Sequence, residues 1–258
     1  MSETVIQVTS LGKRIKGKTI LEEISFEINK GDCVALIGPN GAGKTVLMSC
    51  ILGDKKPSGG QVLIDGKAGK AKNKIAVLLQ ENTIPNSLKV KELIAFFQSI
   101  SDNPLTNQEV QELLQFKEDQ YQQFADKLSG GQRRLLAFVL CLIDKPKILF
   151  LDEPTAGMDT STRQRFWEIV NDLKKSGVTI LYSSHYIEEV EHTADRILVL
   201  HQGKLIRDTT PYTMRHEEKE KQVTLPSSFV SIVHGLPDIN EITEKRDVIS
   251  FMTKDIEK

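Results

Sequence analysis

Residues 38–45 constrain the fold of this chain more than any other stretch. They read Gly-Pro-Asn-Gly-Ala-Gly-Lys-Thr, which fits the pattern Gly-x-x-x-x-Gly-Lys-Thr of a phosphate-binding loop. The apolar run 33–37 before the loop predicts a buried strand, and the run 46–52, closed by Gly53, predicts a helix. A glycine loop between a strand and a helix is the context in which this motif binds phosphate.

The chemistry of the loop follows from its residue types. The glycines let the backbone curl so that several N–H groups point at one spot, and the helix N-terminus adds partial positive charge there. We expect Lys44 to reach the β- and γ-phosphates of a nucleotide and the Thr45 hydroxyl to bind Mg²⁺. A glycine-rich turn without a ligand is the alternative. The residues expected to hold the nucleotide are Gly38, Pro39, Asn40, Gly41, Ala42, Gly43, Lys44, Thr45 and Val46.

Composition restricts the classes of protein to which the chain can belong. The 258 residues carry a formal net charge of −1, with basic residues scattered, so we expect no nucleic-acid partner. The three cysteines lie in apolar runs without metal-ligand spacing and predict no disulfide framework, which suits the cytoplasm. Neither a signal peptide nor an apolar run of the roughly 20 residues that a spanning helix needs is found in the sequence. If the protein works at a membrane, we expect another chain to supply the spans.

The N-terminal part of the chain alternates between strands and turns. Residues 5–9 and 24–28 have the period-two pattern of half-exposed antiparallel strands, joined by a polar loop or hairpin. Residues 75–79 predict a buried strand that ends at Gln80. From about residue 83 to 144 the apolar spacing becomes helical, which predicts an inserted, mainly helical subdomain.

The second half of the chain returns to strands that alternate with helices. Residues 147–151 predict a buried strand that ends at Asp152 and Glu153, and residues 178–182 predict another that ends near His185. This alternation favours a parallel sheet, whose ligands lie at the carboxyl ends of the strands. The polar residues named here are all expected at that edge.

The stretch 128–132 reads Leu-Ser-Gly-Gly-Gln. Ser129, Gly130 and Gly131 are expected to open a helix that begins near Gln132, so that its free N–H groups and the serine hydroxyl form a second anion site. An ordinary serine N-cap is the alternative. The same five residues are the signature sequence of ATP-binding cassette (ABC) ATPases, and the order of motifs from residue 5 to about 210 resembles that family.

The resemblance implies a fold class and a domain organisation. The fold expected is α/β: a P-loop NTPase core of the ABC ATPase type with an N-terminal antiparallel β subdomain, an inserted helical subdomain at about 83–144 and a small C-terminal appendage. We expect the nucleotide-binding domain to comprise residues 1–216. Residues 217–258 begin charged and then predict a strand, a helix at 229–236 and a strand at 247–253.

The resemblance also implies roles for residues around the nucleotide. Lys44 and the loop backbone hold the phosphates of ATP, and Thr45 and Asp152, the Walker B carboxylate, hold Mg²⁺. Gln80 resembles the Q-loop glutamine, which touches the metal or the attacking water and couples to a membrane partner. Glu153 is the implied general base, because it follows the metal-binding carboxylate directly and can orient and polarise water.

The resemblance also implies a role for His185 at the nucleotide and roles for other residues at a second subunit. His185 resembles the switch histidine that contacts the γ-phosphate, and Asp159 matches the D-loop that crosses between subunits. In this family two cassettes pack head to tail, and the signature of each, here Ser129 to Gln132, closes over the nucleotide of the other. We therefore expect a second ABC ATPase subunit, in a homo- or heterodimer, together with an integral membrane permease.

Two residues depart from the pattern of the family. The position of the aromatic residue that stacks on adenine aligns with Ile15, which offers no π-face and predicts weaker or less selective binding of the base. Val46 follows Thr45 where many members have a second hydroxyl. Because Thr45 keeps the metal ligand, we expect hydrolysis to survive the change at Val46.

Three functions are compatible with these residues. The leading one is the ATP-hydrolysing subunit of an ABC transporter, cytoplasmic and peripheral on the inner face of the membrane. Residues 151–160 and 182–191 resemble the bacterial drug-export branch, which favours export. The alternatives are a non-transport ABC ATPase, for example of the iron–sulfur cluster assembly type, and a regulatory module that binds nucleotide without turnover. Intact Lys44, Asp152 and Glu153 argue against the last.

Overall fold

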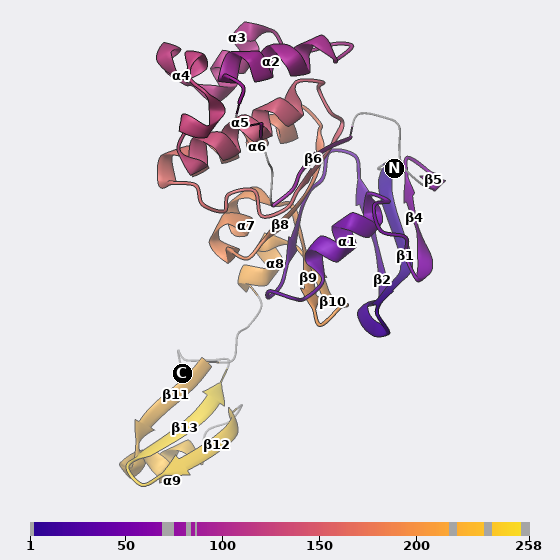
Figure 1. Cartoon of the computed structure of the whole chain (residues 1–258). Coiled ribbons are helices and arrows are strands. Elements are labelled where there is room, and N and C mark those ends of the chain that lie inside the picture. The colour runs from indigo at the N-terminus through magenta and orange to yellow at the C-terminus, as the bar shows by residue number, and fades with distance from the viewer. Residues whose placement is uncertain are drawn as a thin grey trace. The chain divides into compact units, whose positions relative to one another are not determined.

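The structure is a computed structural model that describes residues 3–68, 75–80, 84–85, 87–216, 221–234 and 239–253. The chain divides into two compact units, Met1–Pro211 and Tyr212–Lys258 (Figure 1). The division falls at the start of α8 (Pro211–His216), whereas the boundary predicted from the sequence lies at the end of this helix.

The first unit begins with an antiparallel sheet in the order β2-β1-β4-β5. Its strands are β1 (Thr4–Ile15), β2 (Lys18–Asn29), β4 (Gly59–Ile64) and β5 (Lys67–Ala68). Strands β1 and β2 are longer than predicted, because the polar stretch between residues 11 and 18 continues the ladder as a hairpin. The chain reverses at Lys16 and Gly17, whose positive φ angles of 49° and 80° suit a two-residue hairpin turn.

A six-stranded sheet in the order β10-β9-β3-β8-β7-β6 forms the centre of this unit. Its strands are β3 (Cys33–Ile37), β6 (Ile75–Leu78), β7 (Ile148–Leu151), β8 (Thr179–Ser184), β9 (Arg196–His201) and β10 (Lys204–Thr209). All neighbouring pairs are parallel except β9 and β10, which confirms the predicted parallel sheet. Every residue of β3, β7 and β8 is buried: β3 and β7 are apolar throughout, and β8 also buries Thr179, Ser183 and Ser184.

The helices of the first unit differ in how they begin, since only some of them have a side-chain N-cap. They are α1 (Lys44–Ile51), α2 (Val90–Ser99), α3 (Asn107–Leu114), α4 (Glu118–Gln122), the 3₁₀ turn η1 (Ala125–Lys127), α5 (Gly130–Leu142), α6 (Thr160–Lys175) and α7 (Ile187–Thr193). Figure 1 shows α2, α3 and α4 gathered at one end, and α5 contacts α2, α3 and β6. Among the residues that the structure describes, no helix has the length and apolar character needed to cross a membrane.

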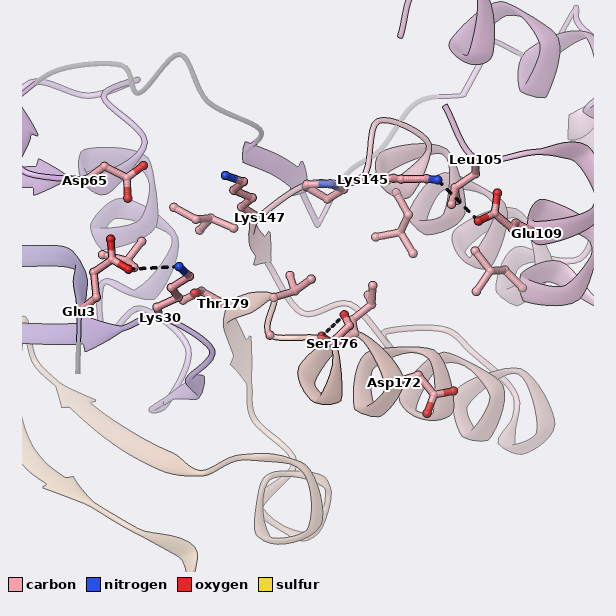
Figure 2. Close-up of a pocket in the computed structure, with 18 of the residues that line it drawn as sticks. Glu3, Lys30, Asp65, Leu105, Glu109, Lys145, Lys147, Asp172, Ser176 and Thr179 are labelled. Atoms are coloured by element: carbon pink, nitrogen blue, oxygen red, sulfur yellow. Dashed lines mark hydrogen bonds and ion pairs between the residues drawn. The ribbon is translucent and has the colours of Figure 1, made fainter. Parts of the chain in front are cut away.

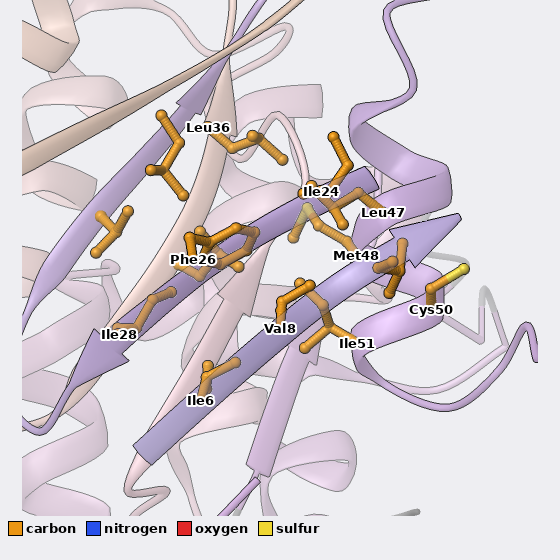
Figure 3. Packing of buried hydrophobic residues seen from close by; sticks show 14 of the residues in the cluster. Ile6, Val8, Ile24, Phe26, Ile28, Leu36, Leu47, Met48, Cys50 and Ile51 are labelled. Atoms are coloured by element: carbon orange, nitrogen blue, oxygen red, sulfur yellow. The ribbon is translucent and has the colours of Figure 1, made fainter. Parts of the chain in front are cut away.

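One hydrophobic core joins the antiparallel sheet to α1 and the central sheet (Figure 3). The side chains that Figure 3 labels come from β1, β2, β3 and α1: Ile6, Val8, Ile24, Phe26, Ile28, Leu36, Leu47, Met48, Cys50 and Ile51. Leu36 and Leu47 are fully buried, so both elements that flank the phosphate-binding loop are anchored in this core. The loop is therefore held by packing on both of its sides.

The second unit has a sheet in the order β11-β13-β12. Its elements are β11 (Lys221–Pro226), the 3₁₀ turn η2 (Ser227–Phe229), α9 (Val230–Val233), β12 (Ile239–Lys245) and β13 (Val248–Thr253). The helix predicted at 229–236 is a 3₁₀ turn followed by one short helix, and residues 235–238 lie outside the described part. Strand β12 was not predicted, because its largely polar sequence hides the alternation. The core of this unit is Val233, Ile249 and Phe251.

Candidate functional site

The phosphate-binding loop joins β3 to α1 at the carboxyl end of the central sheet. Gly38 has a φ of 156°, and a Cβ there would lie 2.1 Å from the Leu200 carbonyl oxygen, so only glycine fits. Gly43, with a φ of 107°, is the N-cap of α1, and a Cβ there would lie 2.8 Å from the Leu21 side chain. The first N–H groups of α1 have no partner within the helix and are free to bind an anion.

Lys44 is buried and folds back over the loop. Its Nζ donates to the Gly38 carbonyl at 2.8 Å and lies 3.4 Å from the Pro39 carbonyl oxygen. The turn of the loop is completed by Asn40, Gly41 and Ala42. The Ala42 N–H donates to the Pro39 carbonyl at 3.1 Å and closes this turn. The loop thus holds the Lys44 ammonium against its own backbone carbonyls.

Val46 differs from the rest of the loop, because its side chain packs against the core. What this residue can offer a ligand is the backbone N–H in the first turn of α1.

Asp152 follows β7 directly and is almost fully buried. Its Oδ2 accepts a hydrogen bond from the Thr45 hydroxyl at 2.9 Å, and its Oδ1 accepts one from the Ser183 hydroxyl at 2.6 Å. Ser183 also accepts the Glu153 N–H at 2.9 Å. Ser183 was not singled out in the sequence, although its place one residue from the end of β8 is a signal that could have found it.

Glu153 lies between a cation and an imidazole. Its Oε1 is 3.9 Å from the Lys44 Nζ, and its Oε2 is 3.4 Å from the His185 Nδ1. The Glu153 side chain is 13% exposed and that of His185 is 41% exposed, so the carboxylate is sheltered while the imidazole stays open to a ligand. Glu153 also has a φ of 43°, a left-handed conformation that few non-glycine residues adopt and that concentrates at functional sites.

Of the residues predicted to act in catalysis or to bind the metal, Gln80 is the one whose side chain lies apart from the cluster of Lys44, Thr45, Asp152, Glu153 and His185. It is exposed, two residues after β6, and among the described residues no hydrogen bond from its side chain is present. Its backbone is held instead by Arg134 of α5, a buried side chain that the sequence analysis missed. The pair Arg133-Arg134 at the start of an otherwise apolar helical run was the available signal.

Arg134 donates hydrogen bonds to main-chain carbonyls at the ends of two strands. Its Nη1 reaches the Leu79 and Gln80 carbonyls at 2.5 and 3.0 Å. Its Nη2 and Nε reach the carbonyls of Asp152 at 3.0 Å and Pro154 at 3.1 Å. Burial lowers the pKa of this guanidinium. The first turn of α5 is thereby tied to the segments that carry Gln80 and the acidic pair.

The signature stretch lies at the N-terminus of α5, which begins at Gly130 and not near Gln132 as predicted. Ser129 is its N-cap, and its hydroxyl accepts the Gln132 N–H at 3.2 Å while the Gln132 Oε1 accepts the Ser129 N–H. The serine is therefore an N-cap, yet its own hydroxyl proton remains available for an anion. Gly131 leaves room for Asp159, because a Cβ there would lie 3.1 Å from the Asp159 Oδ2.

Asp159 is the N-cap of α6. Its carboxylate accepts hydrogen bonds from the Ser161 hydroxyl at 2.7 Å and from the Thr162 N–H and hydroxyl at 3.0 and 2.8 Å. These bonds, that of Ser161 foremost, hold the pKa of Asp159 far below its usual range. Asp159 therefore stays ionised and fixes the turn that leads from Glu153 into α6.

Ile15 lies at the end of β1, where it pairs with Lys18 next to the hairpin turn. It is 37% exposed, so the side chain that aligns with the stacking position presents an aliphatic surface to solvent.

A crevice of about 1010 Å³ opens at the opposite, amino end of the central sheet (Figure 2). Charged side chains on its walls form ion pairs, Glu3 with Lys30 at 3.1 Å and Glu109 with Lys145 at 3.6 Å. None of the residues predicted to bind nucleotide or metal lines it.

Comparison with known proteins identifies the family. The sequence profile of the ABC transporter family matches residues 21–156. The linearmycin resistance ATP-binding protein LnrL of Bacillus subtilis is 34% identical, over 93% of this chain and 82% of LnrL. The probable multidrug ABC transporter ATP-binding protein YbhF of Escherichia coli is 30% identical over 90% of this chain, which spans only 42% of YbhF.

Solved structures share the fold. The protein cbiO1 of Clostridium perfringens, part of the ABC transporter complex cbiONQ, has a TM-score of 0.72 and 26% sequence identity, over 83% of this chain and 92% of that chain. The resemblance read from the phosphate-binding loop and the Leu-Ser-Gly-Gly-Gln stretch is confirmed: the chain belongs to the ABC transporter family.

Proposed function

We propose that this chain is the ATP-binding and ATP-hydrolysing subunit of an ABC transporter and drives export through a separate permease. The observation that carries the proposal is the cluster in which Glu153 lies 3.9 Å from Lys44 and 3.4 Å from His185, beside an Asp152 bonded to Thr45. The names of these relatives, a probable multidrug ABC transporter ATP-binding protein and a linearmycin resistance ATP-binding protein, favour a transporter over an ATPase of iron–sulfur cluster assembly.

The phosphates of ATP are proposed to lie in the loop from Gly38 to Val46. Backbone N–H groups at the start of α1 supply hydrogen bonds and partial positive charge. Lys44 supplies a full charge, and its present bonds to the Gly38 and Pro39 carbonyls show that it already lies over the loop. Because these groups are placed by the fold, little reorganisation is needed when the nucleotide binds.

Thr45 and Asp152 are proposed to hold Mg²⁺. Both offer oxygen atoms, the ligands that Mg²⁺ prefers, and they lie 2.9 Å apart. The described residues contain no group of three or more His, Cys, Asp or Glu that could hold a metal. One carboxylate and one hydroxyl suit Mg²⁺, which commonly takes its other ligands from water and substrate phosphates. When bound, the ion would neutralise phosphate charge, and Gln80 is proposed to contribute from its exposed position.

Glu153 is proposed to be the general base. The sheltered Glu153 carboxylate can orient a water molecule and accept a proton from it. The Ser183 hydroxyl fixes the Glu153 backbone by accepting its N–H. His185 is proposed to contact the γ-phosphate, because its imidazole is open on one side and touches Glu153 on the other. Phosphoryl transfer depends chiefly on positioning and neutralisation of charge, which these groups provide.

The complete site is proposed to need two cassettes. The chain has a phosphate-binding loop and a second helix N-terminus, at Ser129 to Gln132, which no described contact joins to that loop. In a head-to-tail homo- or heterodimer this second terminus would close over the partner's nucleotide, with Asp159 in the segment between subunits. We place the protein in the cytoplasm, on the inner face of the membrane beside its permease, and expect no nucleic-acid partner.

The assignment of domains is part of the proposal. Residues 1–216 carry the nucleotide-binding domain, with the helical subdomain at about 83–144. Residues 217–258 form an accessory segment whose three strands and short helices have a core of their own.

The variants Glu153→Gln and Lys44→Ala test this function. Glutamine keeps the shape of Glu153 but cannot take a proton, so phosphate release should fall by about 10²–10⁴-fold while ATP binding is kept. Glu153→Gln should then accumulate as an ATP-bound dimer on size-exclusion chromatography, whereas Lys44→Ala should bind ATP poorly and remain monomeric. Glu118→Gln, an exposed change on α4, is the matched control. Hydrolysis by Glu153→Gln at the wild-type rate would show that Glu153 is not the base.

A further inference from the structure

Glu189 is a sheltered carboxylate to which the site described above assigns no role. It lies on α7, and its side chain is 11% exposed. Its Oε2 and Oε1 accept the Thr155 hydroxyl at 3.0 and 3.3 Å, and its Oε1 lies 3.3 Å from the Nε of Arg163. A sheltered charge is costly unless it is paired and hydrogen-bonded, so these partners account for its position.

Arg163 contacts both Glu189 and Tyr186, the residue that follows His185. Its guanidinium carbon lies 5.3 Å from the centre of the Tyr186 ring, within the range of a cation–π contact. The Tyr186 ring in turn lies 4.0 Å from the His185 ring, centre to centre, at an interplanar angle of 38°. Because the Tyr186 side chain is exposed, this stack is held from one side, by Arg163.

The contacts form a closed circuit. Thr155 is two residues after Glu153, and the Glu153 Oε2 lies 3.4 Å from the His185 Nδ1. From His185 the circuit returns through Tyr186, Arg163 and Glu189 to Thr155. The side chains come from three places in the chain: the turn after β7, helix α6, and the segment that opens α7.

We propose that Glu189 is a positioning residue for hydrolysis: with Arg163 and Tyr186 it braces His185 against Glu153. This inference rests on the function proposed above. The His185 side chain is 41% exposed, and among the described residues its ion-pair contact is with Glu153 and its ring contact is with Tyr186, so its orientation depends on the brace. Displacement of a reacting group by about 1 Å can cost roughly 10²-fold in rate, so a small rotation of this ring matters.

The test is steady-state ATP hydrolysis by Glu189→Gln. Glutamine still accepts the Thr155 hydroxyl but no longer pairs with Arg163. We expect kcat to fall by about 10- to 100-fold while KM for ATP stays within about twofold, because the phosphate-binding loop is untouched. The control is Glu188→Gln on the same helix, exposed and outside the circuit, which should keep the wild-type kcat.

A second pair of measurements separates the brace from a merely structural role. Tyr186→Leu, at an exposed position with little bearing on folding, should also lower kcat without raising KM. Arg163→Met combined with Glu189→Gln should lower kcat no further than either change alone, because both break one circuit. Wild-type kcat in Glu189→Gln or Tyr186→Leu, or fully additive losses, would overturn the brace. Absence of hydrolysis by the wild-type protein would instead overturn the proposed function.

Discussion

Replacing Arg134 by methionine should separate α5 from the strand ends that carry the site. Methionine fills the volume of the aliphatic stem but donates no hydrogen bond. The carbonyls of Leu79, Gln80, Asp152 and Pro154 all lose a donor, and the chain around Gln80 loses its tie to α5.

The magnitude follows from where these acceptors lie. Leu79 and Gln80 are exposed, so water can replace the guanidinium at their carbonyls. Asp152 and Pro154 are buried, and each carbonyl that loses its partner costs about 1–3 kcal/mol. Burying the charged guanidinium of Arg134 has a dehydration cost, which also lowers its pKa. Methionine carries no charge, so the variant avoids this cost, and the saving offsets part of the lost stability. We expect the free energy of unfolding to fall by about 2–4 kcal/mol.

Urea unfolding followed by circular dichroism measures this difference, and phosphate release measures its effect on turnover. Arg133→Met is the matched control, since Arg133 is its half-exposed neighbour on α5, and it should change the free energy by less than about 0.5 kcal/mol. Arg134→Lys should recover part of the stability but not all of it, because an ammonium cannot span both strand ends. Equal stability of Arg134→Met and Arg133→Met would refute the reasoning.

Three other outcomes are expected from single residues. Ile15→Tyr should tighten ATP binding by about 0.5–1.5 kcal/mol through stacking, measured by calorimetry; an unchanged affinity would place adenine elsewhere. Ser183→Ala removes a donor to Asp152 and an acceptor for the Glu153 N–H, so it should lower the free energy of unfolding by about 1–3 kcal/mol and lower kcat more than ATP affinity. Burial raises the pKa of the Cys33 thiol from 9.0 to about 12, so the native protein should resist iodoacetamide at pH 9, as mass spectrometry of that peptide can check. The unfolded thiol ionises first, so this group's contribution to stability should fall as the pH rises from about 9 to 12, and Cys33→Ala should remove that slope.

Much of the site could be predicted because its signals are local. The phosphate-binding loop is one contiguous stretch whose glycines are required by backbone angles and close contacts at Gly38 and Gly43. Asp152, Glu153 and His185 follow buried strands, and parallel strands bring their carboxyl ends to one edge whatever the details of packing. The N-cap of α6 is also local, because Asp159 accepts the N–H of Thr162, three residues away.

Other features required the tertiary structure, since they join residues that are distant in the chain. Arg134 is 55 residues from Leu79, and Thr155 is 34 residues from Glu189, so no pattern of neighbouring residues indicates either contact. The length of the β1–β2 hairpin and the existence of β12 also depended on pairing, because polar residues stay in a ladder when a partner strand satisfies their backbone. Local patterns in the sequence thus determined the family and the loop in which we propose that phosphate binds. The tertiary structure decided which distant side chains, Arg134 and Glu189 above all, hold those residues in place, because burial and pairing depend on the whole fold.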